Sequence, residues 1–284
     1  MRRLTTLAFS LLFIGALKAQ VNNDLLFYDP EDRTIFYRYM AEFSGKKNLS
    51  NSELLIKTAE YFLGTPYVNF TLEATSPNEK LIINLRELDC TTYTETVLAL
   101  VRTLKSDTLT FEKYADELRK IRFRGGVIDG FVSRLHYFSD WIYDNERMGI
   151  VKNLTRQAGG RPLVIDAYLM SRVSRNYRQL VADSTLIPPI REIEQQISAR
   201  RHYYIPKNAL RADKIQDGDI LAMNRDGRGI GITHMGFAVK KNGVVYFMHA
   251  SSTGKRVMIT EEPFVDYLAR IRTNRGFMIV RPVF

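Results

Sequence analysis

One cysteine is the first candidate for chemistry in this chain. Cys90 is the single cysteine among 284 residues. From Asp89 onward, apolar residues recur at helical spacing to about Lys105, and Asp89 is a natural N-cap. Cys90 is therefore predicted in the first turn, where the helix dipole and free backbone N–H groups favour the thiolate and lower its pKa. The interpretations are a nucleophile beside an oxyanion site or a small buried core residue.

Two of the four histidines lie in a predicted β-hairpin. Asn242 and Gly243 separate two runs of strand-forming residues, which is typical of a two-residue turn. Such a turn places Gly236 opposite His249 and puts His234 and His249 on one face of the sheet. The two histidines are then diagonal neighbours, with a glycine leaving room between them. Their rings are predicted to lie within hydrogen-bond reach of each other.

Together these residues predict a Cys–His–His relay. Cys90 is the candidate nucleophile, His234 the general base and acid, and His249 the group that orients the His234 ring. The alternative is that both histidines are satisfied members of a half-buried sheet. His136 and His202 show no comparable pattern, and His202 is predicted at the surface.

The elements that must position these residues follow from periodicity and from helix breakers. Two adjacent prolines mark one helix start, because proline fits the first turn of a helix. The segment from about 111 to 206 is predicted to be a helical insertion. The expected elements are a helix over 27–43, a helix over 52–63 capped by Ser52, the Cys90 helix, a helix from about Ile190 and mostly strands from about Tyr203.

The first 19 residues match a secretory signal peptide. Arg2 and Arg3 precede an apolar stretch over 7–17, and small Ala19 offers a cleavage point. The stretch is shorter than the ~20 residues of a membrane span. The processed chain is therefore expected outside the cytoplasm without an integral membrane segment. A basic chain in that location, with formal net charge +10 before processing, favours anionic polymers or membrane surfaces and makes nucleic acid a poor partner.

Composition further restricts the class of protein to which the chain can belong. The chain is 45% hydrophobic and 25% charged, with 9 Pro and 17 Gly, which excludes disordered, collagen-like and multi-pass membrane proteins. One cysteine excludes an intramolecular disulfide framework and a cysteine-rich zinc site. No cofactor and no metal are implied.

Five short motifs in a fixed order carry a resemblance to a known family. They lie at 63–67, 89–90, 218–220, 234–237 and 249–251. The order of a cysteine opening a helix, a strand with histidine and a strand with a second polar residue resembles the NlpC/P60 cysteine peptidases. The resemblance implies an α+β, papain-like fold, in which an N-terminal catalytic cysteine helix packs on a C-terminal antiparallel β-sheet.

The long segment 67–90, the insertion at about 111–206 and residues 133–141 resemble the N-acetylmuramoyl-L-alanine amidase-like branch of that superfamily. The resemblance implies one catalytic domain over 20–284 with a helical insertion. It also implies hydrolysis of the amide between N-acetylmuramic acid and L-alanine through a thioester intermediate. The partners would be peptidoglycan fragments in the periplasm or cell envelope of a bacterium.

The resemblance also implies substrate-binding residues. Tyr67 would lie beside the nucleophile and help to bind substrate or the oxyanion, and Asp89 would support the site from the preceding position. Arg134 and Trp141 would contact a saccharide or a carboxylate. For Arg134 and Trp141, packing between helices is the alternative role.

Three other functions stay open from the sequence. An endopeptidase would cut between D-glutamate and diaminopimelate within the stem peptide. A non-catalytic module would bind muropeptides with the fold retained. A metalloamidase is less favoured, because the His-x-x-x-His pairing with an adjacent Glu that many zinc hydrolases carry is absent.

Overall fold

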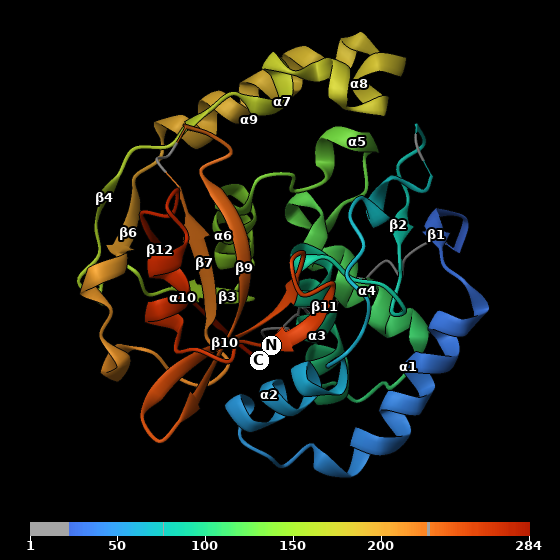
Figure 1. The fold of residues 1–284 in the computed structure, drawn as a ribbon. Helices are drawn as coiled ribbons and strands as arrows, with labels where there is room; N and C mark the ends of the chain where they lie inside the picture. Colours follow the sequence, from blue (N-terminus) through green and yellow to red (C-terminus); the bar gives the residue numbers. More distant parts are fainter. Residues whose placement is uncertain (1–22, 76, 226–227) are drawn as a thin grey trace, which may run out of the picture.

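The fold combines α-helices with a large antiparallel sheet, as predicted (Figure 1). The computed structural model describes residues 23–75, 77–225 and 228–284. The predicted signal peptide at 1–19 lies outside the described residues. Within the described part, none of the helices combines the length and apolar character that crossing a membrane requires.

The helices differ widely in length, and the longest is the one that begins at the cysteine. Their bounds, in chain order within the described residues, are α1 (Pro30–Phe43), α2 (Asn51–Tyr61), α3 (Cys90–Lys105), α4 (Phe111–Arg122), α5 (Gly130–Ser133), α6 (Phe138–Arg147), α7 (Leu169–Arg172), α8 (Arg178–Ala182), α9 (Ile187–Ala199) and α10 (Phe264–Arg270).

Three helix starts differ from the prediction, and capping explains each difference. α1 begins three residues later than predicted, because Asp29 forms a capping box ahead of a proline. α2 is capped by Ser50, whose side chain accepts the N–H of Glu53, so Ser52 lies inside the helix. α9 begins at Ile187, and the two prolines therefore occupy its first turn, where a missing N–H is tolerated.

Eight strands form the main sheet, and every pairing in it is antiparallel. The strand bounds are β1 (Leu26–Phe27), β2 (Leu81–Ile82), β3 (Val151–Asn153), β4 (Arg161–Leu163), β5 (Asp166–Ala167), β6 (His202–Pro206), β7 (Ile220–Asn224), β8 (Arg228–Gly229), β9 (Ile232–Lys241), β10 (Val244–Ser251), β11 (Arg256–Ile259) and β12 (Gly276–Pro282). The order across the sheet is β11-β10-β9-β7-β12-β6-β4, with β3 also on β12, while β1-β2 and β5-β8 form two separate parallel pairs.

The segment 111–206 is not helical throughout, which corrects the prediction of a helical insertion. It contains the short strands β3, β4 and β5 and the whole of strand β6. β3 pairs with β12, and β4 pairs with β6, so this segment contributes to the main sheet. Strands of three residues carry too little periodicity to be recognised, and the partner of β3 lies more than 100 residues away in the sequence.

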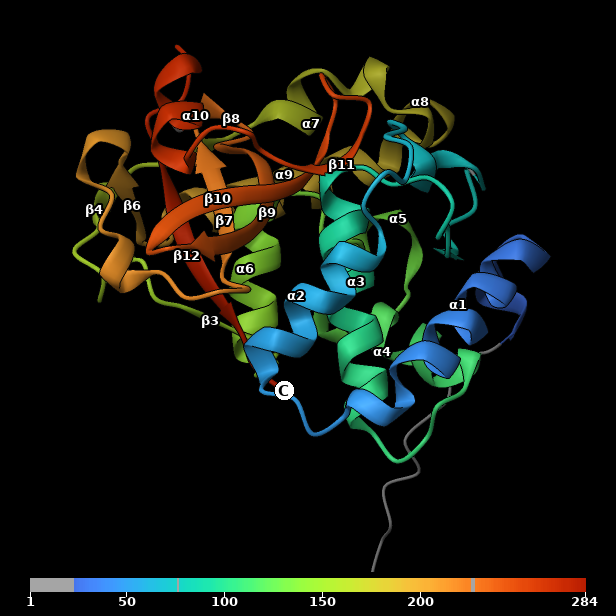
Figure 2. The same ribbon diagram turned by 60° about the horizontal axis from the view of Figure 1, so that its bottom comes forward.

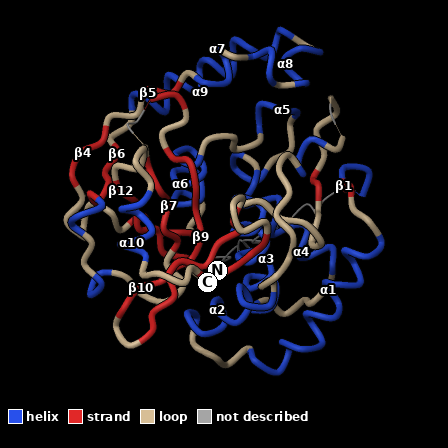
Figure 3. The backbone as a smooth tube through the Cα atoms, viewed as in Figure 1, coloured by secondary structure: helices blue, strands red, loops and turns tan. Residues whose placement is uncertain are grey.

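The main sheet is covered on both faces. Alternate residues point to opposite faces, as the two-residue period of a strand requires. Ala222 and Met278 belong to the core that includes α3, whereas Leu221 and Phe277 belong to a second core with Phe264 of α10. Figure 2 shows α10 on one side of the β9–β10 pair and α2 and α3 on the other, and Figure 3 shows α1 to α4 gathered beside the strands.

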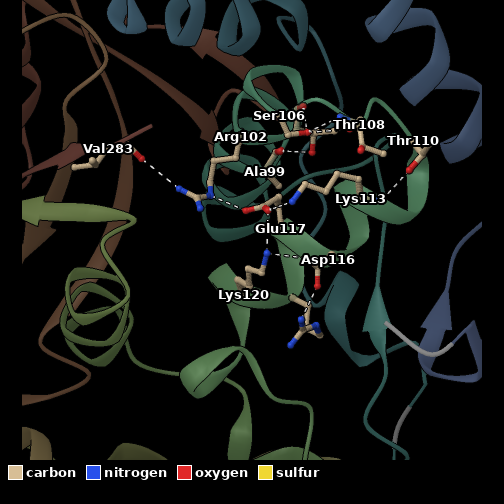
Figure 4. A network of polar contacts seen from close by, with 12 residues as sticks. Ala99, Arg102, Ser106, Thr108, Thr110, Lys113, Asp116, Glu117, Lys120 and Val283 are labelled. Carbon is tan, nitrogen blue, oxygen red and sulfur yellow. Dashed lines mark hydrogen bonds and ion pairs between the residues drawn. The ribbon is translucent and has the colours of Figure 1, made fainter. Parts of the chain in front are cut away.

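A charge network fastens the C-terminal end of α3 (Figure 4). Arg102 Nε donates to Glu117 of α4 at 2.8 Å, and its guanidinium also donates to the carbonyl of Val283 at 3.3 Å. Lys113 and Lys120 donate to the other Glu117 oxygen at 2.6 and 3.0 Å. Burial alone would raise the pKa of Glu117, but the three cations outweigh burial and lower it to about 2. The network therefore fixes α3 to α4 and to the end of the chain.

Candidate active site

Cys90 is the first residue of α3, in the predicted position. Asp89 caps the helix, because its Oδ1 accepts the N–H of Thr92 at 2.8 Å while Thr92 Oγ1 accepts the N–H of Asp89 at 2.9 Å. One turn on, the ring of Tyr93 packs edge-on against Phe237 of β9, with 5.6 Å between centroids. The cap fixes where the helix starts, and the aromatic contact fixes it against β9.

The hairpin of β9 and β10 has the predicted register. Lys241 faces Val244, and the two turn residues between them have φ angles of 52° and 81°. A Cβ on Gly236 would lie 2.5 Å from the carbonyl oxygen of Met248 and 2.7 Å from the Cβ of His249. Only glycine therefore allows the close approach that brings the two histidines together.

The two imidazoles form a hydrogen-bonded pair. His234 Nε2 and His249 Nδ1 lie 2.7 Å apart, and the ring planes are 84° to each other. Phe247 stacks on His249 at 4.6 Å between centroids, and Tyr267 lies at 5.4 Å. Burial lowers the pKa of His234 to about 4, and burial together with the neighbouring ring lowers the pKa of His249 to about 3. Both rings are neutral at pH 7.

The thiol is also neutral, contrary to the expectation of a lowered pKa. Burial raises the pKa of Cys90 to about 12, and the charge of Asp89 acts in the same direction. The N–H groups of Cys90 and Met235 and the hydroxyl of Thr91 favour the thiolate but do not outweigh burial. Desolvation therefore overcomes the helix N-terminus at this position.

The thiol and the imidazole pair approach each other at the start of β9. The Cys90 sulfur lies by the backbone N–H of Met235, the residue after His234. Thr233 lines both the cavity that contains Cys90, about 350 Å³, and the cavity that contains His234 and His249, about 180 Å³. We name them the thiol cavity and the imidazole cavity. Among the described residues, no hydrogen bond joins the thiol to either ring.

Tyr67 lies in the wall of the thiol cavity. Its hydroxyl donates to Asn69 Oδ1 at 2.7 Å. Burial raises the pKa of Tyr67 to about 12, and the Cys90 thiolate, where it forms, and the Asp89 carboxylate act in the same direction. The phenol is thus a protonated donor close to the thiol.

Arg134 and Asp89 also line the thiol cavity, but internal contacts occupy their charged groups. Arg134 is 6% exposed at its side chain and pairs with Glu73 at 2.9 Å and with Glu79 at 3.3 Å. Its remaining guanidinium nitrogen donates to the carbonyl of Leu72 at 3.0 Å. The Asp89 carboxylate serves the cap of α3. Both residues therefore hold the cavity wall in place.

Two expectations about side chains are wrong. Trp141 is fully buried and donates its Nε1–H to Glu95 at 3.2 Å, so it cannot contact a saccharide. Glu95 also pairs with Arg122 at 2.7 Å. This buried cluster joins α3, which contains Glu95, to α4 and α6. His202 is half-buried rather than at the surface, and its Nε2 lies 2.8 Å from the carbonyl oxygen of Ile197.

Two ring-bearing residues of the thiol cavity, His136 and Phe70, were not among the predicted site residues. His136 lines the cavity, and its Nε2 lies 2.7 Å from the carbonyl oxygen of Phe131. Because that oxygen can only accept, Nε2 carries the proton and Nδ1 is an acceptor. Phe70 lines the same cavity. No local pattern marks either residue, although His136 follows Arg134 by two positions.

This arrangement contains the parts that nucleophilic attack on a carbonyl requires. It has a thiol on the first residue of a helix, whose N–H groups lack intrahelical partners, and a neutral imidazole with a second ring to orient it. Within residues 23–75, 77–225 and 228–284, no group of three or more His, Cys, Asp or Glu residues is placed to hold a metal ion.

Comparison with family models identifies a family that covers most of the chain. The AmiA-like family, described as N-acetylmuramoyl-L-alanine amidase-like, matches residues 57–276. This range contains the cysteine, both histidines of the pair and all residues of the thiol cavity. A comparison with curated proteins gives no match.

Solved structures show the same fold. An N-acetylmuramoyl-L-alanine amidase from Bacteroides uniformis is 34% identical with a TM-score of 0.78, covering 82% of this chain and 99% of its own. A Bacteroides fragilis protein provisionally named a xylanase is 31% identical with a TM-score of 0.75. The match covers 79% of this chain and 99% of that protein. A Legionella pneumophila protein is 20% identical with a TM-score of 0.65, covering 89% and 94%, and shows similarity of fold alone.

Proposed function

Because the chain belongs to the AmiA-like, N-acetylmuramoyl-L-alanine amidase-like family, we propose that it is a cysteine-dependent amidase. It cleaves the amide between N-acetylmuramic acid and L-alanine in peptidoglycan fragments. The observation that carries the proposal is the imidazole pair, 2.7 Å apart, at the strand against which the Cys90 helix packs. The family and the Bacteroides uniformis amidase support the choice of bond.

We further propose that the fold is the papain-like NlpC/P60 arrangement and that the protein works in the periplasm or cell envelope. The first part is supported by the order of the cysteine helix α3, the histidine strand β9 and the polar strand β10 along the chain. The second part rests on the secretory character of the first 19 residues.

The first chemical step starts from a neutral thiol and a neutral imidazole. As the Cys90 sulfur attacks the lactyl carbonyl carbon of the muramoyl group, its proton passes to His234 Nδ1. His234 Nε2–H donates to His249 Nδ1 and so stabilises the imidazolium. Substrate must bring the thiol and Nδ1 together, as catalytic hydrogen bonds often tighten only when substrate is bound. The Cys90 N–H can donate to the oxyanion, and the Tyr67 hydroxyl can add a second donor by turning its hydrogen from Asn69 to the oxyanion.

The following steps return the enzyme to its starting state. The imidazolium of His234 gives its proton to the alanine nitrogen, the C–N bond breaks, and the stem peptide leaves with a free amine. The muramoyl group stays on Cys90 as a thioester. Water then loses a proton to His234 and attacks the thioester carbon. The C–S bond breaks, the sulfur recovers the proton from His234, and the muramoyl acid is released.

The xylanase name of one structural neighbour is not supported for this chain. Glycoside hydrolysis ordinarily needs two available carboxyl groups on either side of the scissile bond. Three carboxyl groups line the thiol cavity: Glu73 pairs with Arg134, Glu95 pairs with Arg122, and Asp89 caps α3. None of them is available as an acid or a nucleophile.

Product analysis tests the proposal. Digestion of MurNAc-tripeptide followed by mass spectrometry should show a free peptide that begins with L-alanine. An endopeptidase would instead leave L-Ala-D-Glu on the sugar, and a binding module would leave the substrate intact. Cys90→Ala should abolish turnover while muropeptide still binds, and EDTA should have no effect. Unchanged turnover in Cys90→Ala would remove the cysteine mechanism, and loss of activity with EDTA alone would favour a metalloamidase.

A further inference from the structure

Phe70 has two features that folding alone does not explain. Its side chain is 80% exposed, although it is a large aromatic residue. Its backbone is in the left-handed region, with φ 61° and ψ 25°, which bulky residues rarely adopt. Exposure and a left-handed backbone both lower stability. Such a residue, when it lies at a cavity, is a candidate for contact with ligand.

Phe70 lies where two cavities meet. One is the thiol cavity, and the other, which we name the outer cavity, has a volume of about 540 Å³. Asn69, Phe70 and Glu73 line both cavities, so the two adjoin at this segment. Each volume is in the usual range for small-molecule sites.

The Phe70 segment is tied directly to the reaction centre. Tyr67, which lines the thiol cavity with Cys90, donates its hydroxyl hydrogen to Asn69 at 2.7 Å. On the other side of Phe70, Glu73 accepts from Arg134 at 2.9 Å. The thiol cavity and the outer cavity therefore extend from the thiol past Phe70, and hydrogen bonds anchor Asn69 and Glu73 on either side of this residue.

The direction of the substrate follows from the chemistry, and this step rests on the proposed function. The acyl half stays on Cys90, whereas the amine must receive its proton from His234. Cys90 lines the thiol cavity, and His234 lines the imidazole cavity. For a muramoyl–alanine amide the acyl half is the one that carries the sugar. The saccharide therefore belongs on the Phe70 side, and the stem peptide belongs on the imidazole side.

We propose that Phe70 is a stacking platform for a pyranose ring and that the thiol cavity and the outer cavity together form the saccharide groove. The apolar face of a pyranose matches the face of an aromatic ring. Asn176, with an amide side chain, and Tyr177, with a phenol, also line the outer cavity. These groups suit the hydroxyl and acetamido groups of an amino sugar.

Two substrates separate a saccharide contact from a general role. One is GlcNAc-MurNAc-tripeptide, and the other is the same tripeptide carrying only a D-lactyl group. Phe70→Ala should raise KM for the disaccharide substrate about 10-fold, equivalent to about 1.4 kcal/mol, with little change in kcat. It should leave both constants for the lactyl peptide unchanged, and Phe70→Tyr should behave like the wild type. Val164→Ala removes another apolar side chain, which is 82% exposed. This variant should leave kcat and KM unchanged for both substrates.

A second variant separates binding from folding. Phe70→Asn places a residue that tolerates the left-handed region and should raise Tm while still raising KM for the disaccharide substrate. Equal loss on both substrates, or no loss on either, would overturn the proposal. If the wild type cleaves neither substrate, the proposed function fails. Calorimetric binding of the disaccharide tripeptide to Cys90→Ala, with and without Phe70→Ala, would then still decide the role of Phe70, since it needs no turnover.

Discussion

The two ends of α3 lie beside titratable groups in opposite states. At the C-terminal end, Glu117 keeps its charge, with its pKa lowered to about 2. At the N-terminal end, Cys90 has its pKa raised to about 12 and His234 has its pKa lowered to about 4, so both are neutral. One helix therefore joins a region where charge is stabilised to a region where charge is suppressed.

The difference lies in the neighbours, because desolvation acts against the charged form in both regions. Three cations donate to Glu117, and the gain from these contacts exceeds the cost of desolvation. Around Cys90 and His234, desolvation is the leading cause of each pKa shift. The charged network holds the helix in place, whereas the neutral pair is left able to exchange a proton when substrate arrives. Each prediction below alters one end and leaves the other intact.

The largest expected effect comes from removing the second imidazole. His249→Ala should lower kcat/KM on MurNAc-tripeptide by about 1,000-fold, because His234 loses the group that fixes its tautomer and stabilises the imidazolium. His249→Asn, which keeps a polar group, should lose less. Steady-state kinetics with circular dichroism as a folding check measures this.

His202→Asn is the matched control, because it alters a half-buried histidine that does not line the thiol cavity. It should leave kcat/KM within about 2-fold of the wild-type value, which corresponds to a change in activation free energy of at most about 0.4 kcal/mol. Full activity in a folded His249→Ala protein would contradict an orienting role for this ring.

The second effect concerns the charged end. Glu117→Gln should lower the free energy of unfolding by about 2 kcal/mol, because three partly buried cations lose their common partner. Activity at 25 °C should not change. Glu112→Gln on the same helix breaks a more exposed pair with Arg33 and should cost less than about 0.5 kcal/mol. Urea unfolding measures both, and equal losses would show that burial of the network has no special effect.

The smallest expected effect is a difference between the two ends of α3 in how folding stability depends on pH. The folded pKa values of His234 and His249 lie below the unfolded value of 6.5, so the unfolded chain binds more protons between the two values. The stability from the neutral pair is therefore full above about pH 6.5 and is lost as the pH falls through about 4. The stability from Glu117 is full above about pH 4.5 and is lost as the pH falls through about 2.

Urea unfolding at a series of pH values distinguishes these windows. His249→Asn should flatten the fall in stability that starts at pH 6.5 and continues to about pH 3, and Glu117→Gln should flatten only the fall below pH 4.5. Identical pH dependence in both variants would mean that the two ends of α3 do not titrate independently.

Features with a local cause could be predicted from the sequence. The Asp89 cap depends on residues within one turn, and the β9–β10 register depends on the two turn residues between these strands. Gly236 opposite His249 follows from that register, and the imidazole contact follows in turn. The cysteine helix and the hairpin were therefore predicted correctly without any knowledge of the rest of the fold.

Features that depend on distant partners could not be predicted in the same way. Trp141 is buried by Glu95 and its surroundings, 46 positions away in the chain, and its sequence neighbourhood does not show this. Arg134 is occupied by residues 61 and 62 positions away. The pKa of Cys90 depends on how deeply the helix end is buried, and a helix N-terminus alone predicts the opposite direction. Phe70 is recognised only once two cavities are seen to meet at it.

The place of β12 in the sheet has a consequence for how the molecule is made. This strand contains almost the last residues of the chain, yet it lies between β7 on one side and β6 and β3 on the other. Until β12 has been synthesised, the strands β11-β10-β9-β7 and the pair β6-β4 are separate sheets with open edges, and β3 lacks its partner. A growing chain therefore cannot complete the main sheet before β12 is made. A premature stop before Gly276 should yield no folded protein.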